Sequence, residues 1–162
     1  MSVTKEARIK ILSELYEVEA SLFTDDDEAP EFFEDDNKPV EPEIMEINSI
    51  GSICDDGERV TVSYEESDAT GMQGSVTSLT FLKSDPSIVT MMRTGLVSAT
   101  LVFEEGKRHH CIYKTPFMPF EVCIHTTKVV NLLNVGSTLE LDYIVEIRGA
   151  KAERTKFKMQ IL

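Results

Sequence analysis

The chain has 162 residues, of which 41% are hydrophobic, and it carries a formal net charge of −13 at pH 7. This length fits one domain with a substantial core, and the apolar content is that of a globular rather than a disordered chain. The acidic balance disfavours a general nucleic-acid-binding protein, because a negatively charged surface repels phosphate backbones.

The N-terminal residues and the cysteines bear on the compartment. Charges occur throughout the first fifteen residues, so we expect no secretory signal peptide. No segment approaches the ~20 consecutive apolar residues that cross a bilayer, and we expect no membrane association. The three cysteines, Cys54, Cys111 and Cys123, form no CxxC pair, and their odd number argues against a disulfide framework. These features predict a cytoplasmic protein.

The first predicted element covers residues 7–20, and the residues alone leave its type open. Ile9, Leu12 and Tyr16 recur at a spacing that suits a helix. Ile9 and Ile11 instead alternate as they would in a strand. The residues alone therefore allow either a helix or a strand in this segment.

An acidic tract follows this element. Residues 24–46 contain 11 acidic side chains against a single basic one, Lys38. Residues 1–66 carry a balance of −15, whereas residues 67–162 carry +2. Acidic tracts that contain prolines, as this one does, usually stay disordered. We predict a flexible acidic loop at residues 24–43; the alternative is an arm that contacts a basic protein partner.

Beyond residue 43 the hydrophobic pattern has a period of two, which is typical of half-buried strands. Val60, Val62 and Tyr64, for example, share one strand face. The pattern predicts about nine strands after the acidic loop, with a turn at Glu105-Gly106 between two of them. The strand segments are 44–53, 59–67, 75–83, 87–95, two within 96–114, 120–130, 138–149 and 155–162.

These segments predict the fold class. Evenly spaced short strands without a strong helix indicate an antiparallel barrel or sandwich. Connections of hairpin length favour an up-and-down meander, and closure of the sheet would protect its edges. We therefore predict an all-β, antiparallel up-and-down meander of about ten strands, closed into a barrel and forming a single domain over residues 1–162. We expect four bulky residues to face inward, where they could fill the barrel: Phe81, Phe103, Tyr143 and Phe157.

Five short segments carry a family resemblance. They are "VSYEES" at 62–67, "MMRTG" at 91–95, "LVFEEG" at 101–106, "YKTPF" at 113–117 and "LELDY" at 139–143. Together, in this order, they resemble the YwiB-like bacterial family, a domain of unknown function with a calycin-like β-barrel, over roughly residues 44–162. The resemblance implies a lipocalin-like closed barrel in which residues 7–20 form the first strand and the acidic tract enlarges the first loop. It implies no activity, because none is assigned to the family.

The stretch 108–128 holds all three histidines and two of the three cysteines. It is predicted to form two paired strands, so their register decides which side chains share a face. In one register, four of them converge as a Cys₂His₂ set of the ligand types that zinc prefers. These residues are His109, Cys111, Cys123 and His125.

The other register differs by one residue. It turns Cys111 inward, leaves His110 and His125 in water, and allows Lys114 to pair with Glu121. We favour this register because it separates core from solvent more cleanly. Zinc sites also tend to draw two ligands from a tight turn, whereas these residues lie in mid-strand. We therefore expect neither a metal nor another cofactor, and the Cys₂His₂ set stays the alternative.

A cysteine–histidine nucleophile is also disfavoured. Such a site needs a thiolate beside an imidazole and a nearby donor that stabilises an oxyanion. Neither Cys111 nor Cys123 is accompanied by a nucleophile elbow, a helix start or a glycine-rich turn. Buried cysteines acting as small hydrophobic residues explain the pattern better, so we expect no enzyme.

Four other residues are candidate ligand-binding residues. Tyr64 and Glu66 share a strand face, Arg93 lies near the end of a strand, and Tyr113 is inward in the favoured register. An arginine in a barrel can bind a ligand carboxylate or phosphate, or can instead pair with a glutamate and close the barrel.

Two functions therefore stay open. The first is a barrel that binds a small apolar or amphipathic ligand, since closed barrels of this size can enclose one. The second is a protein-interaction module whose acidic loop at residues 24–43 contacts a basic partner. The sequence leaves the ligand and the oligomeric state open.

Overall fold

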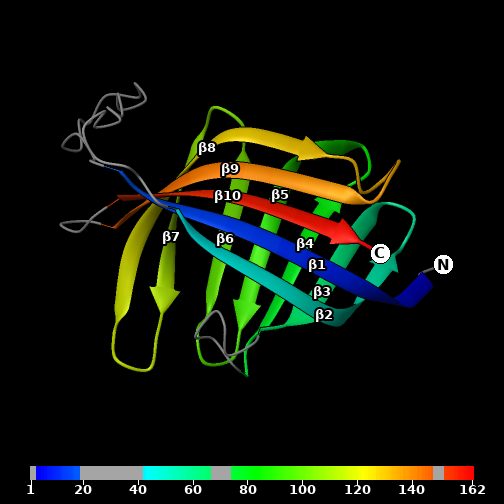
Figure 1. Ribbon diagram of the computed structural model, residues 1–162, viewed down its shortest axis with the longest axis horizontal. Helices are drawn as coiled ribbons and strands as arrows, with labels where there is room; N and C mark the ends of the chain where they lie inside the picture. Colours follow the sequence, from blue (N-terminus) through cyan, green and yellow to red (C-terminus); the bar gives the residue numbers. More distant parts are fainter. Residues whose placement is uncertain (1–2, 19–41, 67–73, 148–151) are drawn as a thin grey trace.

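The computed structural model describes residues 3–18, 42–66, 74–147 and 152–162. These residues form ten antiparallel strands in one sheet, and no helix in these ranges could cross a bilayer (Figure 1). The strands are β1 (Val3–Val18), β2 (Glu43–Asp55), β3 (Arg59–Glu65), β4 (Val76–Leu82), β5 (Asp85–Thr94), β6 (Ala99–Glu104), β7 (Arg108–Lys114), β8 (Pro119–Asn131), β9 (Thr138–Ile147) and β10 (Ala152–Ile161).

The strand order confirms the predicted meander and its nine strands after the first loop. The sheet runs β6-β5-β4-β3-β2-β1-β10-β9-β8-β7, so that β1 pairs with β10 as well as with β2. The first segment is a strand. Ile9 and Ile11, which are both 1% exposed, point into the core, whereas Leu12 on the opposite face is only partly buried. The predicted acidic loop at 24–43 lies outside the described residues, except for its last two positions.

The barrel is nearly closed, and its seam lies between two strands that are consecutive in the chain. β6 and β7 share no continuous ladder of backbone hydrogen bonds. At one end Ser98 and Lys114 exchange two backbone hydrogen bonds of 2.9 Å. At the other end the turn that contains Gly106 bonds to β8, because the Gly106 N–H donates to the Thr126 carbonyl at 2.8 Å. The predicted Glu105-Gly106 turn is present, but it joins two edge strands.

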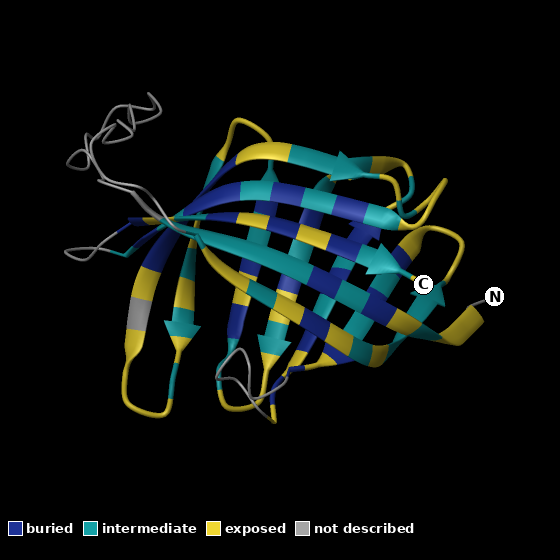
Figure 2. Ribbon diagram, in the orientation of Figure 1, coloured by how far each residue is buried: buried dark blue, intermediate teal, exposed yellow. Residues whose placement is uncertain are grey.

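The four large residues predicted to face inward are all buried. Phe81, Phe103, Phe157 and Tyr143 are between 0% and 7% exposed. The rings of Phe103 and Tyr143 lie 4.6 Å apart, within the range of favourable aromatic contacts. Buried and exposed positions alternate along most strands (Figure 2). This part of the barrel is therefore filled by side chains.

Gly51 on β2 lies close to the backbone of β3. A Cβ atom at this position would lie 2.1 Å from the Ser63 carbonyl oxygen and 2.6 Å from Ile9 Cδ1. We expect Gly51→Ala to destabilise the protein by about 1–3 kcal/mol, as overpacking usually does. Urea unfolding measures this, with the exposed Asn48→Ala on the same strand as the control. A Gly51→Ala variant as stable as the control would contradict the close approach.

Candidate functional site

The four candidate ligand-binding residues gather at one mouth of the barrel. In an up-and-down meander all odd-numbered strands run in the same direction, so β3, β5 and β7 end at the same mouth. Tyr64 and Tyr113 lie one residue before the last of β3 and β7, and so does Arg93 in β5. Glu66 follows β3 directly.

Strand register aligns Tyr64, Arg93 and Tyr113 in one row across the sheet, called the Arg93 row. Tyr64 lies opposite Thr77 on β4, Thr77 lies opposite Arg93, and Arg93 lies opposite Ala99 on β6. Ala99 follows Ser98, which bridges to the residue after Tyr113. Residues opposite one another point to the same side of the sheet, and the small Ala99 side chain leaves room for Arg93 to reach over β6.

Arg93 contacts Tyr113 at one end of the row, and Glu66 near its other end. Its Nη1 atom donates a hydrogen bond of 2.5 Å to the Tyr113 hydroxyl, and its Nε atom lies 3.9 Å from Glu66 Oε1. The Thr77 hydroxyl donates to the same Glu66 oxygen at 2.5 Å. The Glu66 side chain is 1% exposed and that of Arg93 is 16% exposed. Pairing of a barrel arginine with a glutamate is therefore present, as a long ion pair.

Two polar atoms of this ion pair have no hydrogen-bond partner among the described residues. They are Glu66 Oε2, which is an acceptor, and Arg93 Nε, which is a donor. Buried polar groups are normally paired, because an unmade hydrogen bond in the interior costs about 1–3 kcal/mol. The ion pair thus retains one hydrogen-bond acceptor and one donor that no described residue satisfies.

Three tyrosines interact electrostatically with the guanidinium of Arg93. Burial raises the pKa of Tyr143 to about 12 and also raises the pKa of Tyr64, so both hydroxyls are neutral at physiological pH. Burial disfavours the charge on Arg93, but electrostatic interactions with Tyr113, Tyr143, Tyr64 and Glu66 together outweigh this effect and raise the pKa of Arg93. Sequence reasoning placed Tyr143 in the core and did not single out Thr77. In the sequence, only its inward position and its hydroxyl group indicated that Tyr143 could belong to this site.

The register of β7 and β8 separates the four alternative zinc ligands. His109 lies opposite Ile124 and Cys111 lies opposite Val122. His109 and Cys111 therefore share the inward face, while Cys123 and His125 lie on the other face of β8. No group of three or more potential ligands gathers anywhere in the described part of the chain.

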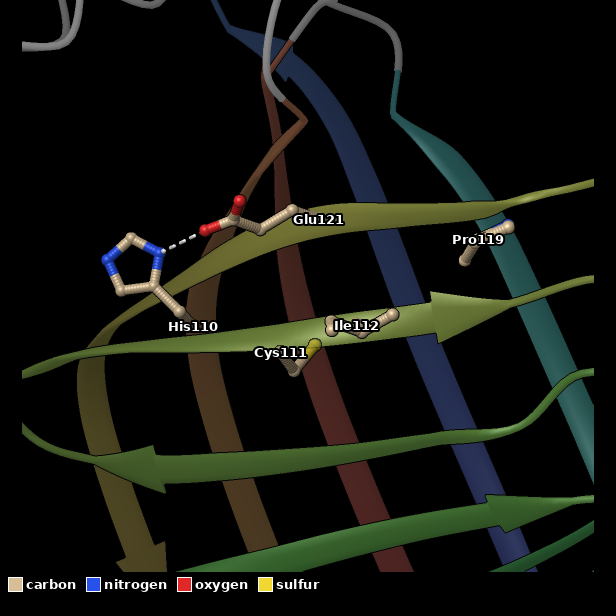
Figure 3. Close-up of a pocket in the computed structure, with 5 residues that line it drawn as sticks. All are labelled: His110, Cys111, Ile112, Pro119 and Glu121. Carbon is tan, nitrogen blue, oxygen red and sulfur yellow. Dashed lines mark ion pairs between the residues drawn. The ribbon is translucent and has the colours of Figure 1, made fainter.

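Two expectations on the outer face were wrong. His125 was expected in water but is 7% exposed, and Cys123 beside it is 2% exposed. β8 is buried on both faces over residues 122–126, so alternation does not separate core from solvent there. Glu121 pairs with His110 at 3.3 Å rather than with Lys114 (Figure 3).

The outer face also holds a buried carboxyl group, Glu146, which lies opposite Cys123. Burial raises the pKa of Glu146, and the charges of Arg108 and His110 oppose this shift in part. Burial lowers the pKa of His125, and Arg108 lowers it further. Because a raised pKa means that the fold favours the neutral acid, the contribution of Glu146 to stability falls as the pH rises from 4.5 through its folded pKa.

We therefore expect the effect of Glu146→Gln to depend on pH. Glutamine keeps the neutral shape, so the variant should gain stability relative to wild type between pH 4 and pH 7. Urea unfolding of both proteins at several pH values measures the difference. A difference that stays constant over this range would contradict the raised pKa of Glu146.

A depression of about 570 Å³ lies at the β7–β8 hairpin, apart from the ion pair. Tyr64, Glu66, Arg93 and Tyr113 do not line it. Burial raises the pKa of the Cys111 thiol at its edge to about 11, so this thiol is protonated at neutral pH. The described residues that line the depression are His110, Cys111, Ile112, Pro119 and Glu121 (Figure 3).

Both the sequence and the fold of this chain are similar to those of known proteins. The model of the family "Domain of unknown function (DUF1934)" matches residues 32–159. The crystal structure of ywiB protein from Bacillus subtilis is similar, with a TM-score of 0.59 and 17% sequence identity, over 97% of this chain and 93% of that chain. At this identity the similarity shows a common fold. No functionally curated protein matches the sequence.

Proposed function

Because the chain belongs to the DUF1934 family, a YwiB-like domain of unknown function, we propose a function from its site: a non-catalytic barrel that binds a small amphipathic ligand. The ligand's polar group contacts Arg93 and Glu66, and its apolar part contacts the tyrosine rings of the same mouth. The protein is proposed to act in the cytoplasm.

One observation carries this proposal, the incomplete ion pair of Arg93 and Glu66. Buried charges are usually both paired and fully hydrogen-bonded. Here the two groups are separated by 3.9 Å, and each retains a buried atom without a partner in the described chain. A ligand that supplies the missing hydrogen bonds would gain affinity from groups that folding has already desolvated.

The packing of the barrel supports a small ligand. Phe103 and Phe81 fill the interior deeper than the Arg93 row, and both are at most 3% exposed. A ligand at Arg93 would therefore occupy the mouth and would not extend through the barrel. This differs from a barrel that encloses a long apolar chain.

The state of the cysteines supports a non-catalytic role. The raised pKa values of Cys111 and Cys123, caused mainly by burial, keep both thiols in the protonated, unreactive form. Cys54, Cys111 and Cys123 are all free. Free thiols suit the reducing cytoplasm that we propose.

A specific observation favours the alternative, an interaction module for a basic protein. Three apolar side chains are exposed near the mouth: Leu96 is 50%, Phe117 95% and Met118 64% exposed. β1 ends and β2 begins at this mouth, so the acidic tract of residues 24–43 joins the barrel at the same mouth. Deletion of that tract should then abolish capture of a basic partner while leaving the barrel folded; unchanged capture would exclude this role.

Native mass spectrometry of freshly purified, tagless protein tests the ligand-binding proposal. We expect a small molecule bound to the wild-type chain and absent from Arg93→Gln. Lys10→Gln is the matched control, since it removes one positive charge from an exposed pair with Glu46. A chain that carries no bound molecule under gentle ionisation, in the wild type as in the variants, would contradict the proposal.

A further inference from the structure

We propose that the polar group of the ligand is a neutral donor–acceptor group, such as a primary amide, and not a carboxylate or phosphate. This inference rests on the proposed function, because it concerns the same site. It changes the expectation from the sequence, in which Arg93 was a candidate anchor for an anionic group.

The hydrogen bonds already present at the ion pair determine which of its atoms are available to a ligand. Tyr113 accepts a hydrogen bond from Arg93 Nη1, and Thr77 donates to Glu66 Oε1. Within this ion pair, the buried atoms without a partner in the described part of the chain are one donor, Arg93 Nε, and one acceptor, Glu66 Oε2. A primary amide offers the complementary pair, because its carbonyl oxygen accepts from Nε and its NH₂ group donates to Oε2. A carboxylate has acceptors only and leaves Oε2 unmatched.

The charge balance of the site also favours a neutral ligand group. Glu66 already supplies one negative charge for the guanidinium of Arg93, at 3.9 Å and with a side chain that is 1% exposed. A second carboxylate would add an uncompensated negative charge beside Glu66 in a largely desolvated site, where like charges repel strongly. A neutral group leaves the net charge of the site at zero. The neighbouring tyrosines do not change this balance, since the raised pKa values of Tyr64 and Tyr143 keep them neutral.

Hexanamide and hexanoate test the inference, because they share an alkyl chain and differ in the polar group. We expect hexanamide to bind wild-type protein on the order of 10- to 100-fold more tightly than hexanoate does. Titration of ¹⁵N-labelled protein at pH 7, followed by NMR, measures both affinities. The shifted amide signals should belong to the strand ends around Glu66, Arg93 and Tyr113.

The Glu66→Gln variant tests whether the negative charge of Glu66 disfavours an anionic ligand. Removing the negative charge should strengthen hexanoate binding by on the order of 10-fold or more relative to wild type. Glu46→Gln is the matched control, since it makes the same change on the outer surface, and it should leave both affinities unchanged. The comparison of the two probes on wild-type protein does not depend on the folding of any variant.

The outcomes separate the two proposals. Wild-type protein that binds hexanoate as tightly as hexanamide would overturn the polar-group inference and leave ligand binding at the mouth intact. Failure of both probes to shift any signal of the Arg93 row would count against the inference and, together with a bare chain in native mass spectrometry, against ligand binding itself. Shifts confined to the β7–β8 depression would also overturn the inference.

Discussion

Replacing Arg93 by leucine is expected to destabilise the barrel by about 3–5 kcal/mol, the usual cost of removing one partner from a buried ion pair. The cost arises because the Glu66 carboxylate, whose side chain is 1% exposed, would lose its counter-charge. The variant also loses the hydrogen bond to Tyr113, which connects β5 to β7 across the seam.

A double-mutant cycle separates the charge effect from lost packing. Urea unfolding of Arg93→Leu, Glu66→Leu and the double variant gives the coupling energy. We expect the double variant to be more stable than Arg93→Leu alone, because no buried charge is left unpaired. Lys10→Leu, in the exposed pair with Glu46, should cost about 0–1 kcal/mol. Costs for Arg93→Leu and Glu66→Leu that simply add would show that the two residues do not form an ion pair in solution.

Replacing Phe103 by alanine is expected to cost about 3–5 kcal/mol, the range for a fully buried aromatic side chain. Phe103 is 0% exposed and its ring contacts that of Tyr143, 4.6 Å away on β9. It lies on β6, which has a continuous backbone ladder only with β5. Side-chain packing therefore supplies much of the stability on the seam side of this strand.

The control for this variant is Phe117→Ala. Phe117 is 95% exposed in the β7–β8 turn, so its replacement should change stability by at most about 0.5 kcal/mol. Thermal and urea unfolding both report the difference. Equal, small effects of the two substitutions would mean that the barrel interior around Phe103 is not packed as described.

The paired strands β7 and β8 show which features of the stretch around His109 could be predicted from the sequence and which could not. Alternation identified the two faces of each strand, and the favoured register was confirmed by Cys111 opposite Val122. The burial of His125 was missed because β8 is covered on both faces there, a property of packing that no alternation within one strand reveals. Glu121 lies opposite Ile112, so His110 and Lys114 are its two diagonal neighbours on β7. Alternation does not choose between them, and the pairing of Glu121 with His110 was therefore missed.

By itself, the sequence determined the class of this protein: its period of two predicts an all-β meander, its short connections predict antiparallel neighbours, and its large residues are assigned correctly to the interior. Only the tertiary structure decided that Tyr64, Thr77, Arg93 and Tyr113 form one row and that the seam falls between β6 and β7. The physical reason is that alternation defines a side chain's face only within its own strand. Which side chains meet across the barrel depends on the backbone hydrogen bonds that set the register of every intervening strand pair.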